Sequence, residues 1–163
     1  MATFGGVPGV ELIYYDVSGS NPGQIRAAID KLRPSDPNDG QRVDALTLHR
    51  FRWRWPIVNG ICDLNQATVA FEARVTLPHL TNLAALPTGL QQGWARYLAG
   101  LEEHEKGHLL NAWNRRDDVL AAIKSARCDT ASDAAKAVLK QINQADIDYD
   151  RRTDHGRRQG ATF

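Results

Sequence analysis

The sequence has little of what marks several other classes of protein. Its 163 residues carry a net charge of only +1, so no overall basic field favours nucleic acid as a partner. No stretch approaches the roughly 18 apolar residues of a membrane span, and no transmembrane segment is expected. Residues 1–9 are uncharged and Gly-rich, unlike a signal peptide. This start is typical of a cytosolic protein or of a mature form behind an added Met.

Cysteine is also scarce, with two residues, Cys62 and Cys128, far apart in the chain. Neither has a second cysteine nearby, which argues against a cysteine-type zinc site. The pair forms either a disulfide or two buried free thiols. A disulfide would close a long loop and stabilise the fold by about 4 kcal/mol on the chain-entropy model. We favour the disulfide, which would imply an oxidising compartment.

What the sequence does contain is a His-Glu-x-x-His motif from His104 to His108. On a helix, residues four apart lie on one face, so both imidazoles can reach a single metal ion. Two imidazoles at this spacing suit Zn²⁺, and Glu105 between them is placed to act on a metal-bound water. The alternative is a charged helix face with two incidental histidines.

The position of the motif favours the metal site. Apolar residues recur around it at steps of three and four, and both histidines lie on or beside this buried stripe. Gly107 costs about 1 kcal/mol relative to Ala inside a helix. We therefore expect another backbone or a substrate to approach the helix closely at Gly107.

The pattern of the remaining chain predicts an α+β fold in one domain, residues 1–163. Residues 10–17, 45–57 and 67–77 read as strands, with Trp53 and Trp55 in the core and Pro78 ending the last of them. Residues 90–127 read as one long helix or as two pieces broken near Gly100 or Asn114, and a further helix ends near Tyr149. We expect a small antiparallel sheet of three or four strands, packed on the motif helix and a second, C-terminal helix in a zincin-like arrangement.

A catalytic zinc site usually has three protein ligands and one open position. His155 is the best candidate for the third, because it follows a helix long enough to pack antiparallel to the motif helix. Asp154 and Asp150 are the next candidates, and either carboxylate could instead orient a ligand histidine from behind. The alternative for His155 is a mobile histidine in a tail rich in arginine.

These stretches together resemble a known family. The matching segments are YYDVSG, RWRWPI, CDLNQATVAFEARVTLP, EHEKGH and YDRRTDHGRRQG, which span nearly the whole chain. They resemble a bacterial family described as predicted secreted zinc-dependent proteases and catalogued as a domain of unknown function. The pairing of the helix motif with T-x-H-G-x-x-Q-G is the specific part. The resemblance implies a zinc ligand at His155, a Cys62–Cys128 bridge and export as a secreted or periplasmic protein.

The first functional hypothesis is therefore a zinc-dependent peptidase acting on a peptide or protein substrate. Zn²⁺ held by His104, His108 and His155 would activate a water, with Glu105 as general base. Tyr149 is a candidate for stabilising the oxyanion, although a Tyr packing at the helix end explains it equally well.

Two other hypotheses remain from the sequence. A non-catalytic zinc-binding or interaction domain would keep the fold without turnover, and Glu105 is the residue that discriminates, because a structural site needs no base. Nucleic-acid binding through Arg50, Arg52, Arg54 and the closing arginine cluster is the weakest hypothesis, given the net charge.

Overall fold

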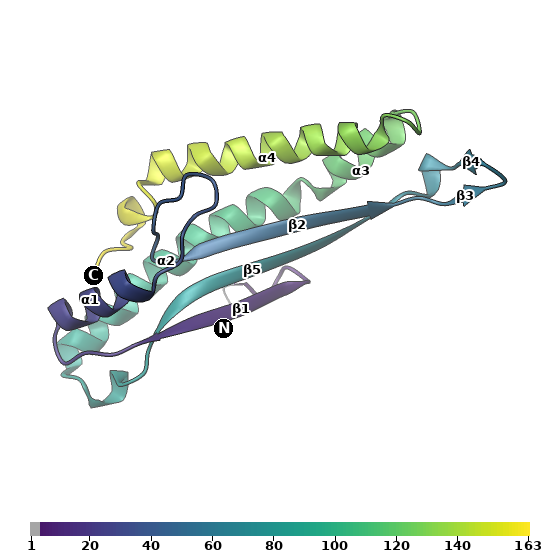
Figure 1. Ribbon diagram of the computed structural model, residues 1–163. Helices are drawn as coiled ribbons and strands as arrows, with labels where there is room; N and C mark the ends of the chain where they lie inside the picture. Colours follow the sequence, from purple (N-terminus) through teal and green to yellow (C-terminus); the bar gives the residue numbers. More distant parts are fainter. Residues whose placement is uncertain (1–3) are drawn as a thin grey trace.

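The computed structural model describes residues 4–163 and shows a three-stranded sheet packed against helices (Figure 1). The strand order is β1 (Val10–Val17), β5 (Thr68–Leu80) and β2 (Leu46–Arg54). β2 runs antiparallel to β5, whereas β1 runs parallel to it. The α+β class is confirmed, but the sheet is mixed and the expected all-antiparallel sheet is wrong. Side chains alternate in the same way in both kinds of pairing, so the pattern carried no information about direction.

The described part of the chain has four α-helices: α1 (Pro22–Leu32), α2 (Thr88–Asn114), α3 (Arg116–Ser125) and α4 (Ala131–Thr153). Only Arg115 separates α2 from α3, so the long helix is bent near Asn114, one of the two expected places. None of the described helices is long and apolar enough to cross a membrane.

α4 packs antiparallel to α2 (Figure 1). Asn111 near the end of α2 donates to the carbonyl of Ile142, in the middle of α4, at 3.2 Å. His104, two turns earlier on α2, lies 3.1 Å from Asp150 near the end of α4. Residues later along α2 therefore contact residues earlier along α4, and the motif faces the last turns of α4.

Local sequence signals explain most element ends. Asn21 caps α1 by accepting from the Gln24 amide at 3.0 Å. β5 does not end at Pro78 but runs on to Leu80. Pairing with β2 ends at Thr76, so beyond that residue β5 has only β1 beside it and its open edge needs no donor from proline.

A short hairpin and a disulfide complete one end of the molecule. β3 (Ile57–Val58) and β4 (Ile61–Cys62) pair around the Asn59–Gly60 turn. Cys62 at the base of this hairpin is bonded to Cys128 in the turn between α3 and α4. The expected disulfide is therefore present, and such bonds persist in oxidising compartments outside the cytoplasm.

The interior consists of two apolar clusters. The larger lies between the sheet, α1 and the first half of α2, and includes Ile25, Val75 and Tyr97, all fully buried. The smaller joins β2 to α3 and α4, and Trp53 and Trp55 pack against it as expected. The motif of α2 lies between Leu101 of the first cluster and Ala112 of the second.

Asp44, just before β2, fixes the loop that precedes the sheet's edge. Its carboxylate accepts from both terminal nitrogens of Arg26, at 2.7 and 2.8 Å, and from the buried Tyr97 hydroxyl at 2.8 Å. Arg33 also donates to this carboxylate, at 3.2 Å. The backbone carbonyl of Asp44 accepts from the Tyr15 hydroxyl at 2.6 Å. α1, α2 and β1 are thereby tied to the start of β2.

We predict that Asp44→Asn lowers the free energy of unfolding by about 2–3 kcal/mol at pH 7, because it leaves the buried Tyr97 hydroxyl and two partly buried arginines without their charged acceptor. Burial would raise the pKa of Asp44, but the hydrogen bonds from Arg26 and Tyr97 outweigh it and lower the pKa. The stabilisation is therefore complete above the ordinary carboxyl pKa of about 4 and is lost as the pH falls through the lower folded value.

Urea unfolding of both forms at several pH values measures this difference. Asp30→Asn is the matched control, since Asp30 pairs with the same two arginines but is half exposed. A loss as large in Asp30→Asn as in Asp44→Asn would contradict the prediction.

Candidate metal centre

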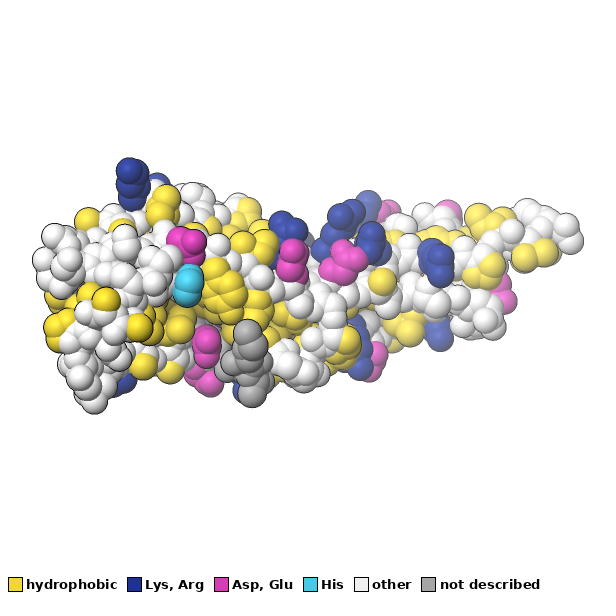
Figure 2. All heavy atoms as spheres, turned by 90° about the horizontal axis from the view of Figure 1, so that it is seen from below, with side chains coloured by type: hydrophobic (Ala, Val, Ile, Leu, Met, Phe, Trp, Pro, Cys, Tyr) yellow, Lys and Arg dark blue, Asp and Glu magenta, His cyan; other side chains and the backbone are white. Residues whose placement is uncertain are grey.

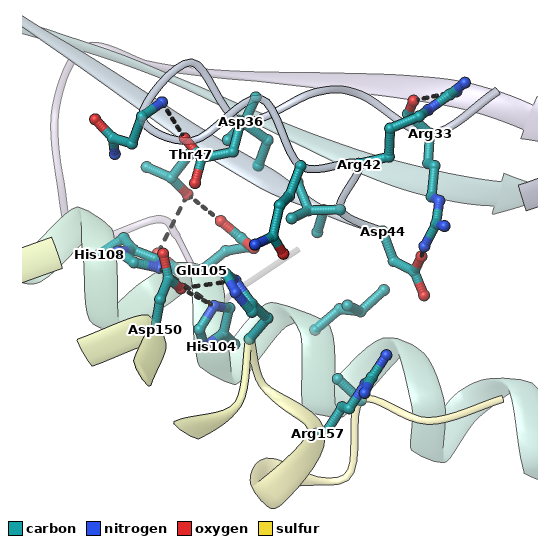
Figure 3. A pocket seen from close by; sticks show the side chains of 18 of the residues that line it. Arg33, Asp36, Arg42, Asp44, Thr47, His104, Glu105, His108, Asp150 and Arg157 are labelled. Carbon is teal, nitrogen blue, oxygen red and sulfur yellow. Dashed lines mark hydrogen bonds and ion pairs between the residues drawn. The ribbon is translucent and has the colours of Figure 1, made fainter. Parts of the chain in front are cut away.

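The histidine motif lies on the buried side of α2. His104 is 4% exposed, Glu105 2% and His108 8%. Asp150, from the penultimate turn of α4, completes a group of three side chains that could hold a metal ion (Figure 3). Of the candidates for a third ligand, the structure thus places Asp150 against both histidines.

The three donor atoms are close to one another. His108 Nε2 lies 3.2 Å from His104 Nε2 and 2.9 Å from Asp150 Oδ1. His104 Nε2 lies 3.1 Å from the same oxygen. Ligand atoms about 2.0–2.1 Å from a tetrahedral zinc ion are separated by roughly 3.3–3.4 Å. An expansion of a few tenths of an ångström would therefore accommodate such an ion.

The second nitrogen of each imidazole is held by an acceptor. His108 Nδ1 lies 3.0 Å from Asp146 Oδ1, and His104 Nδ1 lies 3.0 Å from Gln159 Oε1. The orientation of the Gln159 amide follows from its Nε2, which donates to the Tyr149 hydroxyl at 2.9 Å. Because the facing oxygens only accept, each Nδ1 carries the hydrogen and donates it.

This assignment leaves a lone pair on each Nε2 of the neutral imidazoles. Both lone pairs converge with those of the Asp150 carboxylate in a buried place, an arrangement that is unfavourable without a cation among them. Backing of a ligand histidine by a carboxylate or amide oxygen is typical of metal sites. The residues present therefore fit a bound metal ion by geometry and by donor chemistry.

The acid–base properties agree with this. Burial lowers the pKa of His108, but hydrogen bonds to Asp146 and Asp150 outweigh burial and raise it to about 10. Burial raises the pKa of Asp146, but its contacts with His108 and His49 lower it to about 2. The pKa of Asp150 is lowered by its hydrogen bonds to the two motif histidines. The group thus strongly attracts positive charge, for which a proton and a metal ion compete.

Glu105 lies beside the group and is held by β2. Thr47 donates its hydroxyl hydrogen to Glu105 Oε2 at 2.7 Å. Burial raises the pKa of Glu105, although the nearby histidines and the Thr47 hydrogen bond oppose this. Thr47 therefore orients one oxygen of the carboxylate and links the sheet to the motif helix.

The turn after α4 carries His155. Asp154, His155 and Gly156 all have positive φ, so the chain reverses sharply and the His155 amide donates to the Asp150 carbonyl at 3.0 Å. His155 Nδ1 lies 3.6 Å from Asp150 Oδ1, and its side chain is 34% exposed. His155 is therefore next to the group but is not one of its three members; its role as ligand stays a prediction.

The same turn positions His104. A Cβ at Gly156 would lie 3.0 Å from the Cβ and Cγ atoms of His104, so the turn backbone packs directly on that side chain. Thr153 Oγ1 lies 3.3 Å from His104 Nδ1, next to Gln159. The T-x-H-G-x-x-Q-G motif thus consists largely of residues that hold His104.

Tyr149 explains Gly107. A Cβ at Gly107 would collide with the Tyr149 ring and hydroxyl, so the close approach expected there is made by a side chain. The Tyr149 ring stacks on His104, with centroids 5.1 Å apart and an interplanar angle of 9°. It is not among the residues that line the cavity described next, and its role in oxyanion stabilisation stays a prediction.

A cavity of about 630 Å³ opens onto the group (Figure 3). His104, Glu105, His108 and Asp150 line it on one side, and the start of β2 lines it on the other. Asp154 and His155 also line it. A substrate in this cavity would reach both the donor group and the buried carboxylate.

Comparison with known proteins adds the family. A family described as "bacterial protein of unknown function (DUF922)" matches residues 12–156. The chain belongs to this family. No curated protein and no solved structure matches the chain. The family match spans the motif helix and Asp150, but the family description names neither a metal nor a reaction.

The roles of three residues in the centre were not predicted from the sequence. Asp146 bridges His108 to His49, whose Nε2 lies 2.9 Å from Asp146 Oδ2. The sequence spacing could have predicted the role of Asp146, because Asp146 and Asp150 lie one turn apart on α4, as the two histidines do on α2. Gln159 stands in the T-x-H-G-x-x-Q-G motif, but no role was assigned to it, and Thr47 carries no comparable signal, since hydroxyl residues are common on surfaces.

We predict that Asp150→Asn lowers the metal content of the purified protein, because the amide offers no charge and a weaker donor. His155→Ala should leave the metal content near that of the parent, and Asp154→Asn is the control from the same turn. Metal analysis after dialysis in limiting zinc distinguishes these cases. Loss of metal from His155→Ala and not from Asp150→Asn would instead make His155 the ligand.

Gly107→Ala should displace the Tyr149 ring, although Ala is the better helix former by about 1 kcal/mol. We expect a net loss of about 1–3 kcal/mol in unfolding free energy from overpacking. Gly93→Ala, on the same helix with nothing near its Cβ position, should stabilise instead. Thermal unfolding of the two variants tests the contrast, and stabilisation by both would contradict the close contact.

Proposed function

We propose that the chain is a zinc-dependent peptidase whose metal is held by His104, His108 and a third ligand, Asp150 in the geometry described. The supporting observation is the convergence of three buried lone-pair donors beside an equally buried glutamate. Two imidazoles and one carboxylate are a common ligand set of catalytic zinc, which keeps one position open.

Zinc in such a set would lower the pKa of water to about 7 and polarise a carbonyl oxygen. Glu105 would accept the proton of the attacking water and later deliver it to the leaving amine. Thr47 supports this role by occupying Oε2, which leaves the other oxygen of Glu105 for the proton. Asp146 and Gln159 would keep the ligand imidazoles in one tautomer throughout.

A peptide substrate would bind along the free edge of β2. In the described chain β2 pairs only with β5, so its other edge is free. Residues from both faces of the strand, Leu46, Thr47, Leu48 and His49, line the cavity, so the cavity follows the edge itself. An extended peptide paired there would have its backbone held beside Glu105.

The disulfide supports a secreted or periplasmic location, which we also propose.

We predict that Glu105→Gln lowers kcat/KM for peptide hydrolysis by roughly 10²–10⁴-fold, because the amide cannot take up the proton. Its zinc content should stay at the parent level, since Glu105 is not in the donor group. Glu103→Gln, on the exposed side of the same helix, is the control and should retain activity.

The assay uses zinc-loaded protein and a mixed peptide library read by mass spectrometry. A parent protein that binds zinc and cleaves no peptide would support the non-catalytic zinc-binding domain instead. Equal cleavage by Glu105→Gln and the parent would remove Glu105 as the base.

A further inference from the structure

The β3–β4 hairpin projects from the end of the molecule, beyond the turn that joins α3 to α4 (Figure 1). Three of its residues are the most exposed large hydrophobics in the described chain: Ile57 at 66%, Val58 at 63% and Ile61 at 72%. Val58 lies opposite Ile61, and Ile57 precedes Val58 in β3 and lies opposite Cys62. Such a cluster marks an interaction site, whereas single exposed apolar residues are ordinary.

The fold itself does not require these side chains. The Asn59–Gly60 turn and the pairing of four residues form the hairpin, and polar β-formers would pair equally well. The Cys62–Cys128 bond holds the base of the hairpin against the helices, so the tip is presented outward. At the tapering end of the molecule, hydrophobic atoms reach the surface (Figure 2).

Positive charge extends along β2 behind the tip, and Arg54 is the arginine nearest to it. Arg50, Arg52 and Arg54 alternate along β2 toward the hairpin, on the face opposite the buried Phe51. Arg52 pairs with Glu72. Arg50 and Arg54 are exposed and have no ion pair within residues 4–163. Lys and Arg side chains are visible near the tapering end in Figure 2.

We propose that this hairpin docks the protein on the surface of an anionic lipid bilayer. Ile57, Val58 and Ile61 enter the interfacial region, while Arg50 and Arg54 lie against the headgroups. The proposal is independent of the peptidase function, because the hairpin shares no residue with the metal centre.

The shape of the tip favours lipid over a protein partner. A narrow, convex tip of three aliphatic side chains needs a matching pocket in a protein, whereas a bilayer accommodates it without one. The unpaired backbone groups of Asn59 and Gly60 limit the insertion to the wet interface. Basic residues behind an apolar tip complement anionic headgroups in charge, which a neutral apolar pocket would not require.

Co-sedimentation of the oxidised full chain with large vesicles tests this proposal, using phosphatidylcholine alone and phosphatidylcholine with phosphatidylglycerol. We expect binding to the anionic vesicles and at least tenfold weaker binding to the neutral ones or in 0.5 M salt. Replacing Ile57, Val58 and Ile61 by Ser should reduce the partition coefficient at least tenfold. Arg50→Gln with Arg54→Gln should reduce the salt dependence.

Val58→Trp is a gain-of-function variant, since Trp favours the membrane interface, and it should bind more tightly than the parent. Leu32→Ser, an exposed leucine on α1, is the control and should bind like the parent. Absence of binding to anionic vesicles, or unchanged binding by the triple Ser variant, would overturn the proposal. A parent dimer that the triple Ser variant converts to monomer, without vesicle binding, would overturn it in favour of self-association.

Discussion

Three buried donor atoms meet at one place and attract positive charge, either a proton or a metal ion, and this constraint organises the centre. The Nε2 atoms of His104 and His108 and the Asp150 carboxylate come from two helices that are distant in sequence. Their other contacts, to Asp146 and Gln159, fix which atoms face inward. A helix pair with one carboxylate replaced by an apolar residue would pack as well, so packing alone does not explain the donor set.

The surrounding structure serves to hold α2 in place relative to its neighbours. Thr47 fixes Glu105 from the sheet, Tyr149 stacks on His104 from α4, and the turn at Gly156 closes over the same imidazole. Small residues make these approaches possible, because Gly107 admits the Tyr149 ring and Gly100 lets the helix meet the chain at Gly160. Each contact joins α2 to a different element, so the motif is constrained from several sides.

The sequence was informative where local physics decides the structure. The placement of both motif histidines on one helix face and the bend near Asn114 depend on neighbouring residues, and both were found as expected. The parallel direction of β1 and the continuation of β5 past Pro78 depend on which strand lies beside which. Asp150, and not His155, lies in the group of donor atoms. This depends on the rotation of α4 about its axis and on the left-handed turn after it, which one sequence does not reveal.

One consequence follows from the disulfide and the length of α4. Cys128 precedes α4 by only three residues, and Asp150 lies close to the other end of that helix of 23 residues. At 1.5 Å per residue the helix is about 35 Å long. Its first turn is also held by the fully buried Ala131 and Ala135 and by the hydrogen bond from Trp53 to Ser132, so the disulfide is one of several ties at that end. A covalent crosslink and a cation-binding group thus anchor opposite ends of a single helix.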